Sequence, residues 1–243
     1  MNRRRFLIGA AAMAASPAPP TPAFSDGRTI ILDGREHALS DIIAPSTIPL
    51  VGGAEPASDY ALAALSEIIK RGAPTAAVTE KQDRWGRISG PVRWRTANGR
   101  ETTLQEILLA QGAARVAPET GDFAFLDRCF RAEKAARDGG VGLWAVGAYR
   151  IRDASKGEMA RGFQIYRGVV RKAAEHQGRV YFNFGDDFRS DFTATVRKGA
   201  FRRWKTKLDL ASAAGWAVEV RGRVERINGP SIELLHEMQL RPA

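Results

Sequence analysis

One strand-like segment of this sequence carries side chains that suit binding to a polyanion. Successive side chains of a strand point to opposite faces, so Arg179, Tyr181 and Asn183 share one face and the apolar residues between them share the other. By the same alternation, we expect Arg221 and Arg223 on a later strand to face outward with them. An aromatic ring among arginines can stack on a base and hold phosphates, which predicts a nucleic-acid-binding face. The alternative is a solvated surface with one exposed tyrosine.

The positive charge of the 243-residue chain is concentrated in its second half. Residues 25–149 hold 15 Lys and Arg against 16 Asp and Glu, a net charge of −1, whereas residues 150–243 hold 19 against 11, a net charge of +8. Attraction to nucleic acid or another polyanion should therefore act through the second half. A further basic group beside Trp204, which is equally consistent with a solvated helix face, consists of Arg202, Arg203, Lys205 and Lys207.

The sequence gives no sign of a metal site or a cofactor. His37, His176 and His236 are far apart in the sequence and have no partner at ligand spacing, so we expect each of them at the surface. Cys129 is the single cysteine and cannot form an intramolecular disulfide. It falls at an apolar position of a helical pattern, which predicts a place in the core.

The N-terminus resembles an export signal of the twin-arginine type. Arg3 and Arg4 precede Phe6 and Leu7, and the apolar run that follows is about 10 residues long, too short to span a bilayer as a helix. We therefore interpret residues 1–24 as a signal peptide and expect a periplasmic or secreted protein. A general secretory signal is the alternative and predicts the same compartment.

Residues 25–149 are predicted to fold as a first module of short strands and three helices. Asp33 and Gly34 supply hairpin turn chemistry, and apolar residues recur at helical spacing after Pro56. Strands are expected at 29–32, 39–44, 76–80 and 88–94, and helices at 56–72, 103–112 and 123–138.

A connector at 150–161 is predicted to lead to a second module, residues 162–243. Its strand-like runs lie at 163–171, 179–184 and 192–196, followed by a helix-like piece at 200–205 and two more strands at 216–224 and 231–235. Three strands, a helix and two strands is the order of an OB barrel. We therefore predict a mainly β, α+β protein of two OB-type five-stranded barrels, the first with three helices.

The first module resembles the staphylococcal nuclease (thermonuclease) family over about residues 26–145. The residues that carry this resemblance, in family order and spacing, are Asp26–Thr29, Ile42–Ser46, Asp83–Arg87, Leu104–Ala114 and Glu133–Trp144. The family fold is a five-stranded OB-type barrel with three helices, in agreement with the pattern of elements above. Active members use two aspartates for calcium, a glutamate near the attacking water and two arginines on the phosphate.

Most of the functional positions that the resemblance implies hold other residues here. Arg28 occupies the first aspartate position, Ile43 the second and Ser46 that of the glutamate, while Ala38 replaces the first arginine. Arg87 alone is retained. A cation and an aliphatic chain cannot hold a divalent ion, which prefers several carboxylate oxygens. The resemblance therefore implies a degenerate active site without metal and without a cofactor.

More than one interpretation stays open for Arg28 and for the pair Asp83 and Arg87. Arg28 is either a phosphate-binding charge in the old metal site or an exposed turn arginine. Asp41 lies two residues from Ile43, about 6.6 Å away along a strand, so we do not expect it to replace the lost ligand. Asp83 and Arg87 can equally be a structural pair in a tight turn.

These observations favour an exported, non-catalytic binding or scaffold protein whose ligand is nucleic acid or another polyanion. The alternative is an enzyme, a weak or divergent phosphodiesterase that cleaves nucleic acid. Such an enzyme would need carboxylates that converge near Arg87 from distant parts of the chain.

Overall fold

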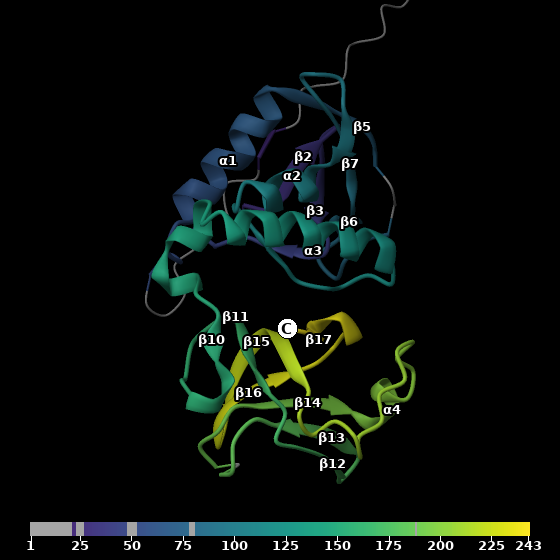
Figure 1. Cartoon of the computed structure of the whole chain (residues 1–243). Helices are drawn as coiled ribbons and strands as arrows, with labels where there is room; N and C mark the ends of the chain where they lie inside the picture. The colour runs from purple at the N-terminus through teal and green to yellow at the C-terminus, as the bar shows by residue number, and fades with distance from the viewer. Residues whose placement is uncertain (1–20, 23–26, 48–52, 78–80, 188) are drawn as a thin grey trace, which may run out of the picture.

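The computed structural model describes residues 21–22, 27–47, 53–77, 81–187 and 189–243. Nearly all of the predicted signal segment lies outside these residues. Strand β1 (Thr21–Pro22) falls within that segment and pairs with β2 (Thr29–Leu32). The chain forms an N-terminal body and a C-terminal body joined by the segment around residue 150 (Figure 1). We refer to them as the first and the second module.

The first module contains three α-helices and several short strands. Its helices are α1 (Ser58–Lys70), α2 (Leu104–Ala110) and α3 (Phe123–Asp138), followed by the 3-10 turns η1 (Gly142–Ala145) and η2 (Gly147–Tyr149). Its strands after β2 are β3 (Arg35–Leu39), β4 (Ile42–Ile43), β5 (Gly72–Ala77), β6 (Ile88–Gly90), β7 (Val92–Thr96), β8 (Glu101–Thr103) and β9 (Arg115–Val116).

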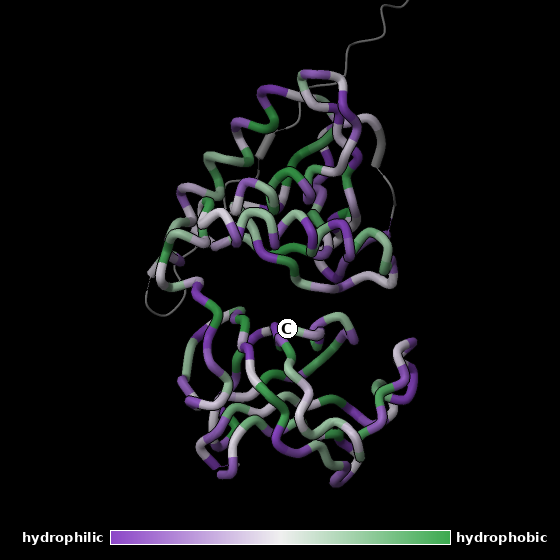
Figure 2. The backbone as a smooth tube through the Cα atoms, viewed as in Figure 1, coloured by the Kyte–Doolittle hydropathy of each residue, from purple (hydrophilic) through white to green (hydrophobic). Residues whose placement is uncertain are grey.

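The second module is mostly sheet. Its strands are β10 (Arg152–Asp153), β11 (Phe163–Val169), β12 (Lys172–His176), β13 (Arg179–Asn183), β14 (Thr193–Arg197), β15 (Ala217–Ile227), β16 (Gly229–Glu233) and β17 (Leu240–Pro242). Its helical pieces are η3 (Ala154–Lys156), α4 (Lys198–Phe201) and η4 (Glu237–Gln239). Polar residues collect on the outer loops, including the turn after α4 (Figure 2).

The strand ladders of the described residues do not close into barrels. The first module has sheets in the orders β1-β2-β3-β6, β5-β7-β8 and β4-β9. The second has one path, β10-β11-β15-β16-β14-β13-β12, with β17 also on β15. Strand β11 carries β15 along one edge and β10 at Tyr166 and Arg167 on the other. The fold is therefore mainly sheet with a few helices, and the predicted pair of five-stranded barrels is not confirmed.

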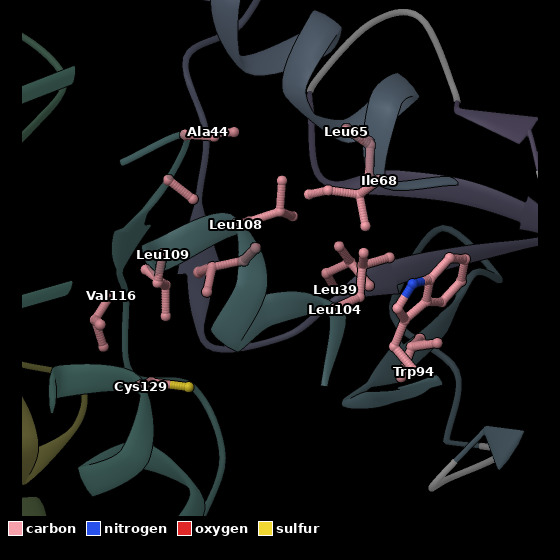
Figure 3. Packing of buried hydrophobic residues seen from close by; sticks show 14 of the residues in the cluster. Leu39, Ala44, Leu65, Ile68, Trp94, Leu104, Leu108, Leu109, Val116 and Cys129 are labelled. Carbon is pink, nitrogen blue, oxygen red and sulfur yellow. The ribbon is translucent and has the colours of Figure 1, made fainter. Parts of the chain in front are cut away.

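Each module buries its own hydrophobic cluster. In the first, Leu65 of α1, Trp94 of β7 and Leu108 of α2 meet at the centre (Figure 3). Cys129 of α3 is fully buried there, as predicted, and burial raises the pKa of its thiol. In the second, Tyr166 stacks on Phe192 with ring centroids 4.1 Å apart. The separate clusters show that the two modules do not share one apolar core.

Helix α3 begins and ends at the residues that the sequence predicts. The Asp122 side chain accepts a hydrogen bond from Phe125 N at 2.9 Å, which caps the N-terminus, and Gly139 follows the last turn. Strand β12, in contrast, is not among the strands that the sequence predicts. Its sequence, Lys172 to His176, has no β-branched residue and forms the edge strand beside β13.

A buried polar interface joins the modules. Arg221 of β15 donates to the Glu133 carboxylate of α3 at 2.8 Å and to the carbonyl oxygen of Val116 at 3.1 Å. The Arg221 and Glu133 side chains are 3% and 2% exposed. Arg115 of β9 donates to the carbonyl oxygen of Phe163 at 2.6 Å. Buried charges are tolerated only with good partners, and these pairs supply such partners across the contact between the modules.

Candidate nucleic-acid interface

Arg28, which the sequence predicts at the position of the first family aspartate, bonds through its guanidinium to its own module. Nη1 of Arg28 lies 3.2 Å from the carbonyl oxygen of Ile42 and 3.3 Å from a carboxylate oxygen of Glu119. The Arg28 side chain is 22% exposed. A positive charge in this place repels a divalent cation and attracts an anion. Arg28 is thus neither an isolated turn residue nor a metal ligand.

The other replaced positions also lack carboxylates. Ala38 is buried on β3, and Ile43 forms part of the wall of a cleft between the modules. The backbone N–H of Ser46 donates to the Glu55 carboxylate at 3.1 Å. At the positions that the sequence predicts for calcium binding and water activation, the side chains of Ile43 and Ser46 are not carboxylates, the ligands that calcium prefers.

Asp41 has a structural role in the same region. It is fully buried, and one carboxylate oxygen accepts the backbone N–H groups of Glu119 and Thr120, each at 2.8 Å. The other oxygen accepts the hydroxyls of Thr120 and Ser40, each at 2.9 Å. Four donors use both oxygens, so Asp41 anchors the loop after β9.

Arg87 is held by a rigid turn. Its Nε donates to Asp83 at 2.8 Å and its Nη1 to the Thr29 hydroxyl at 3.1 Å. Burial opposes ionisation of Asp83, but hydrogen bonds from Arg87 and from two backbone N–H groups outweigh it and lower the pKa. The turn presents Trp85, 63% exposed, with the Arg84 guanidinium 4.0 Å from its ring. Sequence reasoning missed Trp85, although its place between two arginines was the available signal.

Glu119 is the second residue that sequence reasoning missed. Its carboxylate lies beside Arg28, 91 residues away in the chain, and the sequence carries no local motif for it. Partial burial raises the pKa of Glu119, whereas Arg28 and Arg87 act to lower it. A carboxylate that no local motif predicts therefore lies in contact with Arg28.

A cleft of about 320 Å³ lies between the modules at this site. Arg28 and Glu119 line it from the first module, and Arg223 lines it from the second. The other lining residues are Ile43, Ala117, Pro118, Phe163, Gly222, Glu225, Glu233, Leu235 and Gln239. Two of the positions predicted as replaced, Arg28 and Ile43, thus line a cleft to which both modules contribute.

The predicted outer face of β13 is present and holds a second pocket. Val180 and Phe182 are buried, while Arg179, Tyr181 and Asn183 are partly exposed, as the alternation predicts. These three line a pocket of about 200 Å³. The remaining lining residues are Thr193, Thr195, Ile227, Asn228 and Ser231.

Arg179 is positioned for the pocket by its neighbours. It donates to the Thr195 hydroxyl at 2.9 Å and to the Glu233 carboxylate at 3.0 Å. Arg197, directly opposite on β14, lies 3.4 Å from the same carboxylate. Two guanidiniums share one carboxylate, which leaves a net positive charge beside Tyr181.

The expectation that Arg221 joins this outward face is wrong. It is 2% exposed and bound to Glu133, because α3 of the first module covers its end of β15. Arg223, two residues along the same strand, is exposed and lines the cleft between the modules. Strand alternation assigned both residues to one face, but it could not show that a second module covers part of that face.

The histidines also differ in part from expectation. His176 is exposed, whereas His37 is 5% exposed on β3 and His236 is half-buried beside Phe123, with ring centroids 5.6 Å apart. Burial lowers the pKa of both His37 and His236. Within the described ranges, no three His, Cys, Asp or Glu side chains come together as a metal site. None of the helices in those ranges is long and apolar enough to cross a membrane.

The strands and helices of the first module coincide with a match to a known family. Residues 38–146 match the model of the staphylococcal nuclease homologue family. This part of the chain is similar to a staphylococcal nuclease domain. It covers most of the first module and includes Ala38, Ile43, Ser46 and Arg87. A search of curated proteins found no match to the chain.

Proposed function

We propose that this protein binds nucleic acid and does not carry out the calcium-dependent hydrolysis of active staphylococcal nucleases. One observation carries the proposal: the Arg28 guanidinium, at the position where the sequence predicts the first family aspartate, contacts Glu119, while the buried Asp41 already accepts four hydrogen bonds. The staphylococcal nuclease-like domain supports a function related to nucleic acid. The site keeps cationic groups for phosphate but offers no carboxylate set for calcium.

We place the principal contacts on the outer face of the second module. Tyr181 lines the pocket for stacking, Arg179 and Arg197 supply charge beside it, and Asn183 offers an amide. The five strands β11, β15, β16, β14 and β13 follow one another with β14 and β16 parallel, which supports an OB-type arrangement that is opened rather than closed. OB-type surfaces bind single strands by stacking and by charge.

The test combines binding with hydrolysis in one preparation. Labelled single-stranded DNA is titrated with the mature protein, and the same DNA is then incubated with protein and calcium. We expect binding without cleavage. The Tyr181→Ala variant should lose about 1 to 3 kcal/mol of binding free energy because a stacking contact is removed. Exposed Arg100 lines neither pocket, so Arg100→Ala serves as the matched control.

Calcium-dependent cleavage that disappears in Arg87→Ala would overturn the non-catalytic part of the proposal. Absence of binding at low salt would overturn the nucleic-acid part and leave a protein scaffold. Equal losses in Tyr181→Ala and Arg100→Ala would contradict the location of the contacts.

Glu119 favours a second candidate function, a phosphodiesterase that needs no metal. The raised pKa of its carboxylate makes it a stronger base, and Arg28 lies 3.3 Å away to bind phosphate oxygens. Glu119 would take a proton from water as the water oxygen bonds to phosphorus, and the ester P–O bond would break with its oxygen protonated by solvent. Cleavage in the presence of a chelator that is lost in Glu119→Gln supports this candidate. No cleavage under those conditions removes it.

We further propose export to the periplasm by the twin-arginine route, on the basis of Arg3, Arg4, Phe6 and Leu7. Replacement of both arginines by lysine should leave precursor in the cytoplasm, as measured by fractionation. Unchanged export of that variant would point to the general secretory route.

A further inference from the structure

We propose that the Tyr181 pocket and the cleft between the modules form one continuous track for a single strand of nucleic acid. The track runs from the outer face of the second module to Arg28 of the first. This inference rests on the proposed function and extends it, because one strand would then contact both modules at once.

The observation behind the track is that Glu233 and its neighbours join the two sites. Glu233 accepts hydrogen bonds from Arg179, which lines the Tyr181 pocket, and Glu233 itself lines the cleft. Strand β15 joins them as well, since Ile227 lines the pocket and Arg223 lines the cleft. The two sites are therefore neighbours on one sheet face and are not separate depressions.

The charges along this path permit an anionic strand. Two of its three carboxylates are engaged by arginines, Glu119 by Arg28 at 3.3 Å and Glu233 by Arg179 at 3.0 Å. Arg197 lies 3.4 Å from Glu233 as well, and Arg223 is exposed in the cleft. The lining residues themselves balance, with Arg28, Arg179 and Arg223 against Glu119, Glu225 and Glu233, and Arg197 beside Glu233 adds one positive charge. Exposed cations of this kind hold phosphates through charge-assisted hydrogen bonds.

Apolar groups along the path offer surfaces for bases. Ile227 is 59% exposed beside the pocket, and Leu235 is 81% exposed beside the cleft. Phe163 also forms part of the cleft wall but is only 8% exposed, so the exposed apolar surface comes from the other two. Unpaired bases can cover such side chains with their flat faces, whereas paired bases inside a duplex are already stacked. The track therefore favours a single strand over a duplex.

The rigid interface between the modules makes the track a fixed surface. Arg221 and Glu133 are almost fully buried, and Arg137 donates to Glu219 across the same interface at 2.9 Å. Because these bonds fix the cleft width before a ligand arrives, a strand that spans both modules does not have to order them. A strand long enough to reach both modules should therefore bind more tightly than a short strand. The difference should exceed the factor that follows from the larger number of positions at which a long strand can bind.

The experiment compares oligothymidylates of about 4 and about 16 nucleotides, the limits of the site size for one OB module. Anisotropy titrations use the full mature protein and its Tyr181→Ala, Arg223→Ala, Arg28→Ala and Arg100→Ala variants. We expect the short oligomer to require Tyr181 only. The long oligomer should bind more than tenfold more tightly to the parent protein, and Arg28→Ala and Arg223→Ala should each remove most of that gain. Arg100→Ala should change neither titration.

The short oligomer also reports folding, because unchanged short-oligomer affinity in Arg28→Ala shows an intact Tyr181 pocket. If neither oligomer binds to the parent protein, the proposed function fails and the track with it. If both bind with the same affinity after statistical correction, or if the gain survives in both arginine variants, the track is wrong while the proposed function stands. A duplex that binds more tightly than the long single strand would also contradict the track.

Discussion

Strand β15 supplies arginines to two regions with opposite physical character. Arg221 lies in the dry interface between the modules, 2% exposed and bonded to Glu133 and to the carbonyl of Val116. Arg223, two residues later on the same face, is exposed in the cleft. The same residue type thus contributes structure in one region and a candidate ligand contact in the other. The role of each arginine depends on whether α3 covers its side chain and not on its place in the strand.

The difference extends to the neighbours of each arginine. In the interface, Glu219 accepts from Arg137 at 2.9 Å and from Arg167 at 2.7 Å, and Glu133 also accepts the Val116 N–H. The Arg221 and Glu133 side chains at the centre of these bonds are 3% and 2% exposed. In the cleft, the cations border solvent, where ion pairs contribute little to stability. The interface should therefore respond to substitutions through the free energy of unfolding, and the cleft should respond through ligand affinity.

The largest expected effect is that of Arg221→Ala on stability. Removal of the guanidinium leaves the Glu133 carboxylate buried without its counter-charge, which typically costs about 3 to 5 kcal/mol. Denaturant unfolding of the mature protein measures this loss. A variant that combines Arg221→Ala with Arg223→Ala should therefore show a folding defect first.

A double variant sharpens this prediction. Arg221→Met with Glu133→Gln removes both buried charges and keeps an acceptor for the Val116 N–H, so it should recover much of the loss. If Arg221→Ala and the parent protein unfold at the same denaturant concentration, the interface is accessible to water. The proposed difference between the interface and the cleft would then be wrong.

A second buried charge acts inside one module, and its effect should be smaller. Asp41→Ala would leave the backbone N–H groups of Glu119 and Thr120 without their acceptor, at a cost of about 1 to 3 kcal/mol in unfolding free energy. Asp41→Asn retains a carbonyl oxygen and should lose less. Equal losses for the two variants would show that the charge of Asp41, rather than its hydrogen bonds, stabilises the loop.

The third prediction concerns pH. Burial of Glu219 acts against its ionisation, but Arg221, Arg167 and Arg137 outweigh it and lower the pKa below the ordinary value of 4.5. A lowered folded-state pKa gives stability that is present above about pH 4.5 and is lost as the pH falls through the folded value. Glu219→Gln should flatten the decline of unfolding free energy below that pH. An identical acid decline in the variant and the parent would show that other carboxylates account for it.

The sequence predicts local features well and contacts between distant residues poorly, for a physical reason. Helix α3 and the burial of Val180 and Phe182 follow from caps and periodicity, which act within a few residues. Glu119 meets Arg28 across 91 residues, and Arg221 meets Glu133 across 88, where no spacing rule applies. Candidate residues on one strand face can therefore be predicted, but which of them remain exposed cannot.

Arg223→Ala should have the smallest effect on stability. Arg223 is the exposed counterpart of Arg221 on the same strand. The side chain is exposed in the cleft, so the unfolding free energy should change by no more than about 0.5 kcal/mol. Its effect should instead appear in the salt dependence of binding to long single-stranded DNA. One phosphate contact fewer releases about one counterion fewer, so the slope of log affinity against log salt should become shallower by about 0.7. Titrations at several salt concentrations measure the slope, with Arg100→Ala as the control. An unchanged salt slope together with an unchanged unfolding curve would mean that Arg223 contacts neither protein nor ligand. Strand β15 would then contribute one buried arginine to the interface and one solvated arginine without a binding role.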